Sequence, residues 1–236
     1  MITTILFDLD GTLLPMDQDV FVRAYFGELA KKVAPYGYEA KKLFETLWGG
    51  VGAMVRNNGS CTNEEAFWAY FTSVYGEAAL KDKPIFDEFY RVEFQNAAAS
   101  CGFSPESKKI VEELKKAGCR VILATNPLFP ATATESRIRW AGLDPSDFEY
   151  YTTYENSHYC KPNPAYYTEL LQKTGCQPGD CLMVGNDVSE DMVAETLGMS
   201  VFLLTDCLIN KEEKDISVYP HGGFEELREY LQKMNA

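Results

Sequence analysis

Apolar positions divide the chain into a part that forms strands and a part that is only helical. Residues 3–7 make a short apolar run, which predicts a buried strand. Between residues 17 and 97 the apolar spacing becomes helical, and Thr62 with Glu65 predicts a capped helix start there. The first helix of this block repeats apolar side chains every four positions, at Phe21, Tyr25, Leu29 and Val33.

Strand and helix patterns alternate after residue 104. The predicted strands are 120–124, 150–153, 181–184 and 200–204. The predicted helices are 105–117, 130–141, 164–174, 189–197 and 224–234. This alternation predicts an α/β fold, a doubly wound, Rossmann-like parallel sheet with helices on both faces. The helical block is then an inserted second domain, residues 15–98, within a core domain made of 1–14 and 99–236.

Composition narrows the class of protein. Of the 236 residues, 46% are apolar and 24% charged, which excludes a disordered chain. A formal charge of −13 disfavours nucleic-acid binding. The sequence has no apolar stretch long enough to span a membrane and no secretory signal. Seven scattered cysteines without Cys-x-x-Cys spacing favour reduced thiols and a cytoplasmic location.

Polar side chains follow four successive predicted strands. They are Asp8 and Asp10, then Thr125 and Asn126, then Lys161, then Asn186, Asp187 and Asp191. Taken singly, each is an ordinary turn, cap or surface residue. In a parallel sheet, however, strand ends converge on one edge, where ligands bind. Carboxylates suit Mg²⁺, and the amide, hydroxyl and ammonium groups suit an anion. The combination matches phosphoryl transfer.

The order of these residues resembles the haloacid dehalogenase-like (HAD) hydrolase superfamily. The sequence DLDGT at 8–12 is similar to its first motif, and Thr125 in ATN to its second. Lys161 in KPNP is similar to the third motif, and GNDVSED at 185–191 to the fourth. The helical insertion lies where one phosphatase branch carries an α-helical cap between the first and second motifs.

The resemblance implies a role for each matching residue. Asp8 would take the phosphoryl group as an aspartyl-phosphate, and Asp10 would be the general acid and base. Thr125, Asn126 and Lys161 would hold the phosphate. The implied partner is a small phosphorylated metabolite, with neither nucleic acid nor membrane.

The resemblance also implies a bound Mg²⁺, held by Asp8, the backbone carbonyl of Asp10 and the fourth motif. That motif usually has an acid directly after its glycine. Here the position is Asn186, and Asp187 comes next. We expect Asp187 to be the ligand, with Asn186 as the alternative.

Three other functions are compatible with parts of this pattern. The dehalogenases of the superfamily lack the second aspartate of the first motif, so Asp10 favours a phosphatase. A phosphomutase would use the same core, and a binding or regulatory protein would retain the fold with weakened catalysis. Arg137 and Trp140, on the helix after the second motif, are interpreted as packing and surface groups. The sequence leaves the particular phosphate ester and the oligomeric state open.

Overall fold

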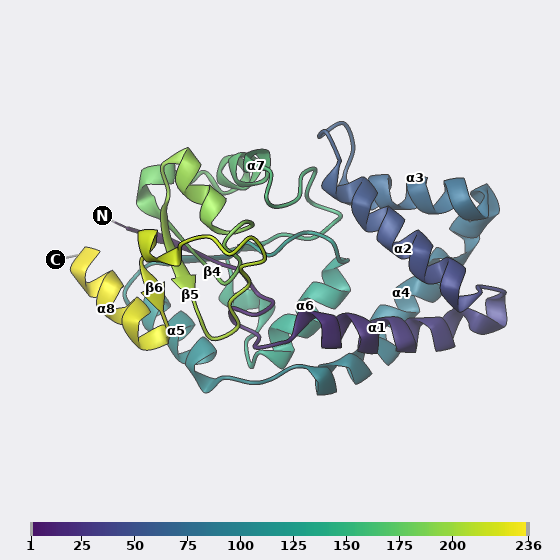
Figure 1. The fold of residues 1–236 in the computed structure, drawn as a ribbon, viewed down its shortest axis with the longest axis horizontal. Helices are drawn as coiled ribbons and strands as arrows, with labels where there is room; N and C mark the ends of the chain where they lie inside the picture. Colours follow the sequence, from purple (N-terminus) through teal and green to yellow (C-terminus); the bar gives the residue numbers. More distant parts are fainter. Residues whose placement is uncertain (1, 235–236) are drawn as a thin grey trace.

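Six parallel strands form one sheet in the order β3-β2-β1-β4-β5-β6 (Figure 1). The computed structural model describes residues 2–234. The strands are β1 (Thr4–Phe7), β2 (Arg120–Leu123), β3 (Tyr150–Tyr151), β4 (Cys181–Gly185), β5 (Ser200–Leu204) and β6 (His221–Gly222). Central β1 pairs with both β2 and β4, so that Phe7 lies beside Leu123 and Val184. The carboxyl ends of these three strands are therefore level.

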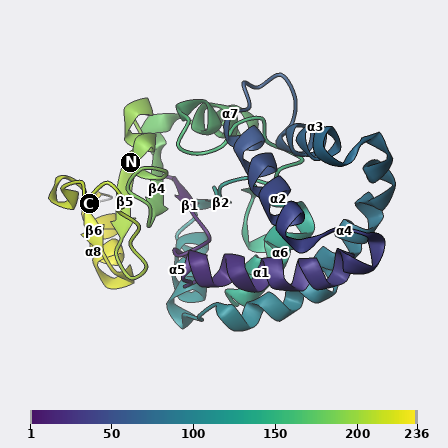
Figure 2. The same cartoon turned by 45° about the vertical axis from the view of Figure 1, so that its right-hand side comes forward.

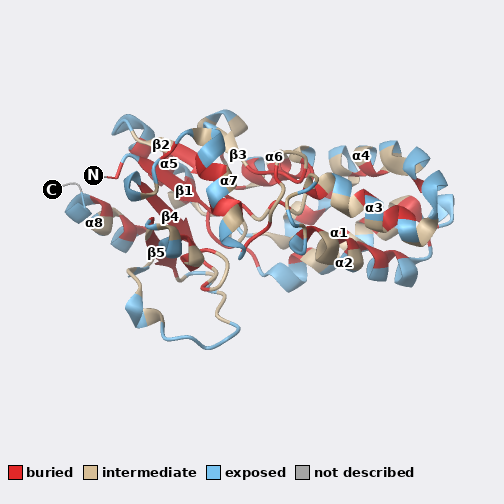
Figure 3. Ribbon diagram, turned by 90° about the horizontal axis from the view of Figure 1, so that it is seen from above, coloured by how far each residue is buried: buried red, intermediate tan, exposed pale blue. Residues whose placement is uncertain are grey.

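Helices cover both faces of the sheet, which confirms the predicted doubly wound fold. They are α5 (Pro105–Lys116), α6 (Ala131–Trp140), α7 (Pro164–Thr174) and α8 (Phe224–Met234). Successive side chains of a strand point to opposite faces. Ile5 and Phe7 accordingly pack in the core beneath α5 and α8, and Leu6 packs in the core beneath α7. Buried residues run along the strands and the inner sides of the helices (Figure 3).

The segment between β1 and α5 contains helices and no sheet strand among its described residues. Its α-helices are α1 (Gln18–Val33), α2 (Ala40–Val55), α3 (Asn63–Tyr75) and α4 (Lys83–Arg91), with 3₁₀ turns at Ala34–Tyr36, Glu77–Asp82 and Glu93–Ser100. The predicted capping box is present, with Thr62 and Glu65 each accepting from the other's backbone N–H. The four α-helices gather to one side of the sheet (Figures 1 and 2).

The chain enters and leaves this helical segment at adjacent points. The Gly102 N–H donates to the Pro15 carbonyl at 2.7 Å, and Met16 pairs with Cys101 in a single antiparallel bridge. A Cβ atom on Gly102 would lie 3.1 Å from the Pro15 Cβ, so the glycine permits this close approach. None of the helices within residues 2–234 is both long and apolar enough to cross a lipid bilayer.

Three parts of the predicted pattern differ from the structure. The strand expected at 150–153 is only Tyr150–Tyr151, and the Thr153 N–H donates to the Asn156 side chain instead of to a neighbouring strand. The helix expected at 189–197 is a 3₁₀ helix that begins at Met192. The Asp187 carboxylate binds the backbone N–H groups of Ser189 and Glu190, which keeps the preceding residues in a turn. Strand β6 was not predicted, because two residues are too short to carry an alternating pattern.

Candidate active site

Asp8 lies directly after β1, in the middle of the carboxyl edge of the sheet. Its N–H continues the ladder by donating to the Val184 carbonyl at 2.9 Å. Its side chain accepts from the Lys161 ammonium at 3.0 Å and from the Thr12 hydroxyl at 3.5 Å. Burial raises the pKa of Asp8 to about 8; Lys161 opposes this rise and Asp191 adds to it. The positive charge of Lys161 therefore does not fully compensate the negative charge around Asp8.

Lys161 is enclosed between two carboxylates. Its ammonium lies 3.0 Å from Asp8 Oδ1 and 2.6 Å from Asp191 Oδ1, and the residue is 1% exposed. Burial disfavours the ammonium charge, but Asp191 and Asp8 outweigh it and raise the pKa of Lys161 well above its ordinary value. A fixed cation therefore stands beside Asp8.

The loop after β4 is built around Asp191. One of its oxygens binds Lys161, and the other accepts from the Asp187 N–H at 2.9 Å. A Cβ atom on Gly185 would lie 2.1 Å from Asp191 Oδ2, so a side chain at position 185 would displace this carboxylate. The Asp187 carboxylate is itself engaged in the loop, as an acceptor for the N–H groups of Ser189 and Glu190 at 2.8 and 2.9 Å.

Asn186 packs against the segment that follows β1. Its Oδ1 accepts from the Thr12 hydroxyl at 3.0 Å, and its Nδ2 donates to the Cys207 carbonyl at 2.7 Å. Gly11 has φ +89°, and a Cβ atom there would lie 2.3 Å from Asn186 Nδ2. The structure thus brings Asn186 to the first motif, while the side chain of Asp187 binds its own turn.

Asp10 forms an ion pair with Arg137 of α6, which the sequence reasoning interpreted as a packing or surface residue. Arg137 is fully buried, and its guanidinium lies 4.4 Å from the centre of the Phe129 ring. The other oxygen of Asp10 is buried without a hydrogen-bond partner among the described residues. The helical spacing could have predicted the burial of Arg137. It lies four residues after Ala133 and four before Ala141, and both alanines are buried.

Thr125 and Asn126 follow β2, beside Asp8 along the edge. The Thr125 carbonyl accepts from the Thr152 and Tyr166 hydroxyls at 2.6 and 2.9 Å, which fixes the backbone at this point. Asn126 Nδ2 donates to Glu190 at 2.9 Å. Burial raises the pKa of Glu190 to about 7. Among the predicted site residues, Lys161 contacts Asp8 directly and Asn186 is joined to it through Thr12, whereas the Asp187 side chain stays in its own turn. Asn126 is held by Glu190, an acid that was not among the predicted site residues.

The chain is similar to known hydrolases. The family model for haloacid dehalogenase-like hydrolases matches residues 2–194. The chain is 25% identical to a phosphoglycolate phosphatase of Vibrio vulnificus (strain CMCP6), over 86% of this chain and 84% of that one. It is 26% identical to a glyceraldehyde 3-phosphate phosphatase of Methanothermobacter thermautotrophicus, over 92% and 91% of the two chains.

A solved structure shares the fold. The 2-haloacid dehalogenase from Pseudomonas syringae pv. Tomato DC3000 superposes with a TM-score of 0.64, covering 99% of this chain and 100% of that one at 19% identity. At this identity the likeness shows the architecture alone.

Proposed function

The chain belongs to the haloacid dehalogenase-like hydrolase family, and we propose that it hydrolyses a small phosphate monoester through a phosphorylated Asp8. The observation that carries the proposal is the buried Asp8 carboxylate at a strand end, with the Lys161 ammonium 3.0 Å away and a second acid, Asp10, two residues on. Asp10 also favours ester hydrolysis over dehalogenation, because an alkoxide leaving group needs a proton and a halide does not.

In the first half of the reaction, Asp8 attacks phosphorus and the bond from phosphorus to the ester oxygen breaks. Asp10 gives its proton to that oxygen, so the alcohol leaves neutral. The Lys161 ammonium offsets negative charge at Asp8 and the phosphoryl group, and Thr125 lies beside them at the end of β2.

In the second half, the ionised Asp10 takes a proton from water. The water oxygen attacks the phosphorus of the aspartyl-phosphate, and inorganic phosphate and the Asp8 carboxylate are released. Arg137 supports this role by fixing one Asp10 oxygen, which leaves the other free of protein partners.

Oxygen atoms at this edge fit a Mg²⁺ ion. No three histidine, cysteine, aspartate or glutamate side chains form a metal cage within residues 2–234. Mg²⁺ does not require one, since it commonly binds one or two carboxylates together with water and substrate phosphate. We assign it to Asp8, the backbone carbonyl of Asp10 and Asn186. The packing of Asn186 against Gly11 and Thr12 supports Asn186 over Asp187. When bound, the ion would neutralise charge on Asp8 and the phosphate.

We also infer that residues 15–98 act as a cap over a core formed by 1–14 and 99–236; residue 1 and residues 235–236 lie outside the described part. The adjacent entry and exit points at Pro15 and Gly102 support a cap that moves as a unit. The two relatives named for phosphoglycolate and glyceraldehyde 3-phosphate support a small phosphorylated metabolite as the substrate. Seven free cysteines fit a reducing, cytoplasmic setting.

Phosphate release from p-nitrophenyl phosphate tests the proposal. We expect activity with Mg²⁺ and none with EDTA. Asp8→Asn should lose more than about a thousandfold in turnover, because the nucleophile is removed. Asp180→Asn, an exposed acid at the opposite edge of the sheet, is the matched control and should retain full activity. An active Asp8→Asn enzyme, or an inactive wild type that binds Mg²⁺, would overturn the proposal.

A further inference from the structure

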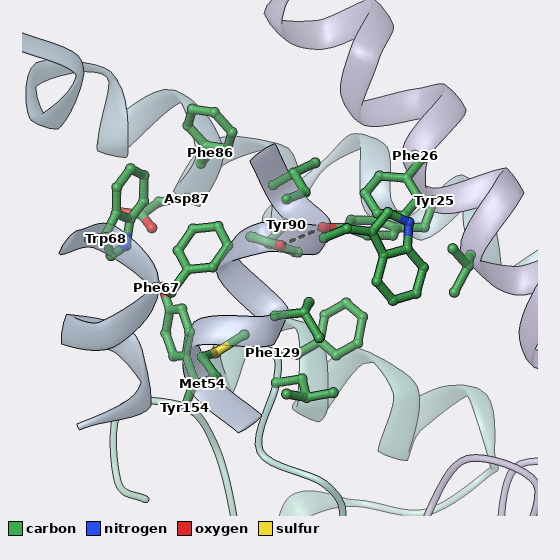
Figure 4. Close-up of a pocket in the computed structure, with 15 residues that line it drawn as sticks. Tyr25, Phe26, Met54, Phe67, Trp68, Phe86, Asp87, Tyr90, Phe129 and Tyr154 are labelled. Carbon is green, nitrogen blue, oxygen red and sulfur yellow. Dashed lines mark hydrogen bonds between the residues drawn. The ribbon is translucent and has the colours of Figure 1, made fainter. Parts of the chain in front are cut away.

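A cavity of about 110 Å³, partly open to solvent, lies between the helices of the cap and the chain that follows β2. Nine of its fifteen lining residues are aromatic. Figure 4 shows rings from several elements around this space, with the hydroxyls of Tyr25 and Tyr90 joined by a hydrogen bond of 3.0 Å. An apolar cavity of this order can hold a small organic group, and this lining offers it mainly ring faces and edges.

The cavity adjoins the proposed catalytic groups. Leu128 and Phe129, on its wall, follow Asn126 by two and three residues. The Phe129 ring also packs against the guanidinium of Arg137, which forms the ion pair with Asp10. A single side chain thus separates the cavity wall from the acid that would protonate the leaving group. The alcohol half of a substrate bound at Asp8 would extend into this space.

The charged side chains that line the cavity are negative only. Asp87 of α4 is an acid on the wall, and the lining contains no lysine, arginine or histidine. The Asp87 carboxylate has no ion pair or hydrogen bond with any other described side chain. The Lys83 ammonium, 5.8 Å from the centre of the Trp68 ring, already pairs with Glu64. An anionic ligand would therefore find a like charge on the wall and no free counter-charge among the lining residues. A cation would find both an unpaired carboxylate and the negative faces of the rings.

One further polar group of the wall lacks a partner. The indole N–H of Trp68 is buried, with the residue 7% exposed, and approaches the Tyr154 hydroxyl without forming a hydrogen bond of normal geometry. A buried donor left without an acceptor is costly. An oxygen atom of a bound ligand would satisfy it.

We propose, on the basis of the phosphatase function above, that the alcohol half of the substrate carries an alkylated ammonium group, which this cavity binds. The aromatic rings hold the cation through their faces, and Asp87 balances its charge. This substrate class differs from phosphoglycolate, whose carboxylate would approach Asp87 with no cation in the cavity wall to balance it.

The test compares kcat/KM for phosphocholine with that for 3,3-dimethylbutyl phosphate, whose alcohol half has the same shape but no charge. Cation–π and charge contacts of this kind predict a preference of about tenfold for phosphocholine. Asp87→Asn should bring the ratio close to one. Asp19→Asn, which removes an exposed acid from the same cap, should leave the ratio at its wild-type value. Phosphoglycolate should be the poorest of the three substrates.

A binding measurement separates this inference from the proposed function. Choline should quench the tryptophan fluorescence of the Asp8→Asn protein, and 3,3-dimethylbutanol should do so only at much higher concentration. If p-nitrophenyl phosphate is hydrolysed but choline neither binds nor favours turnover, the cavity assignment is wrong and the phosphatase stands. If choline binds and no phosphate ester is hydrolysed, the phosphatase proposal fails alone. Equal turnover of the charged and uncharged esters would also overturn the inference.

Discussion

Two buried cations hold the two acids of the first motif, and they do so differently. Lys161 is shared between Asp8 and Asp191, so one positive charge serves two carboxylates. Arg137 forms its ion pair with Asp10. With both carboxyls ionised, the Lys161 group has a net negative charge in a buried place, which helps to raise the pKa of Asp8 and which a divalent cation would offset. Asp10 has its own counter-charge, which holds one oxygen of its carboxyl in place.

Arg137→Gln should impair the enzyme through Asp10. Without the guanidinium, the Asp10 carboxyl loses the contact that orients it, and proton transfer to the leaving group suffers. We expect kcat to fall about a hundredfold for alkyl phosphates. It should fall much less for p-nitrophenyl phosphate, whose phenolate leaves without a full proton.

The ratio of the two substrates identifies the role of Arg137. A loss of stability alone would lower both rates equally, whereas a loss of proton transfer lowers mainly the alkyl rate. Arg137→Lys keeps a cation and should recover part of the alkyl activity. Arg139→Gln is the control, because Arg139 is exposed on the same helix and pairs only locally with Glu135. Equal losses for both substrates in Arg137→Gln would contradict the assignment.

Glu190 makes stability depend on pH. Its pKa rises from 4.5 to about 7 on folding because the carboxyl is buried. The folded state therefore binds this proton more tightly than the unfolded state, and the contribution to stability is present below pH 4.5 and lost as the pH rises through 7. A shift of this size corresponds to about 3 kcal/mol at most.

The Glu190→Gln variant has no carboxyl to ionise, so it does not lose stability as the pH rises. The glutamine side chain can still accept the hydrogen bond from Asn126. In thermal unfolding with EDTA, the Tm of the variant should match the wild type near pH 4 and exceed it increasingly up to pH 8. Glu195→Gln, an exposed acid on the following turn, should show no such trend. A constant difference between Glu190→Gln and wild type at every pH would count against a buried titrating carboxyl.

At the scale of elements, the loop after β4 determines which residue would bind the proposed Mg²⁺ ion. Asn186→Asp places a carboxylate where the amide now touches the first motif. Because ligand charge sets affinity for divalent cations, the Mg²⁺ concentration for half-maximal activity should fall about tenfold. The same change replaces the donor to the Cys207 carbonyl with an acceptor, so the protein should also be less stable.

Asp187→Ala is the paired experiment. It removes the acceptor for two backbone N–H groups of the turn and should lower the free energy of unfolding by about 1 kcal/mol. Its half-saturating Mg²⁺ concentration should stay near the wild-type value. If Asp187→Ala changes the Mg²⁺ dependence and Asn186→Asp leaves it unchanged, Asp187 and not Asn186 is the metal ligand.

The elements most open to prediction were those with a strong local pattern. Helices α7 and α8 and the central strands are fixed by periodicity, caps and breakers that lie within each element. Contacts between distant residues could not be predicted in this way. Arg137 and Asp10 are 127 positions apart, and Lys161 and Asp8 are 153 apart. Burial of these cations depends on how the strand ends meet, so Arg137 resembled an ordinary helix residue and Lys161 a surface one.

At the scale of the whole molecule, one apolar cluster joins the sheet and the cap. It contains Phe7 and Leu123 of the central strands together with Leu29 of α1 and Phe89 of α4. The cap is thus packed on the core through a continuous interior. Shared burial of this kind makes the two parts unfold together, because neither can open without exposing the other's apolar surface.

Leu29→Ala tests this coupling. Leu29 is fully buried in the cap, and its truncation should lower the free energy of unfolding by about 3 kcal/mol. In denaturant, far-ultraviolet circular dichroism and the fluorescence of Trp140, which is on α6 of the core, should shift together in a single transition. Substituting Trp48 and Trp68 with phenylalanine isolates the Trp140 signal, and Val20→Ala on the exposed side of α1 is the control. Leu29 and Trp140 belong to different parts of the molecule. If Leu29→Ala shifts the circular dichroism transition and leaves the Trp140 fluorescence transition in place, the cap unfolds independently of the core.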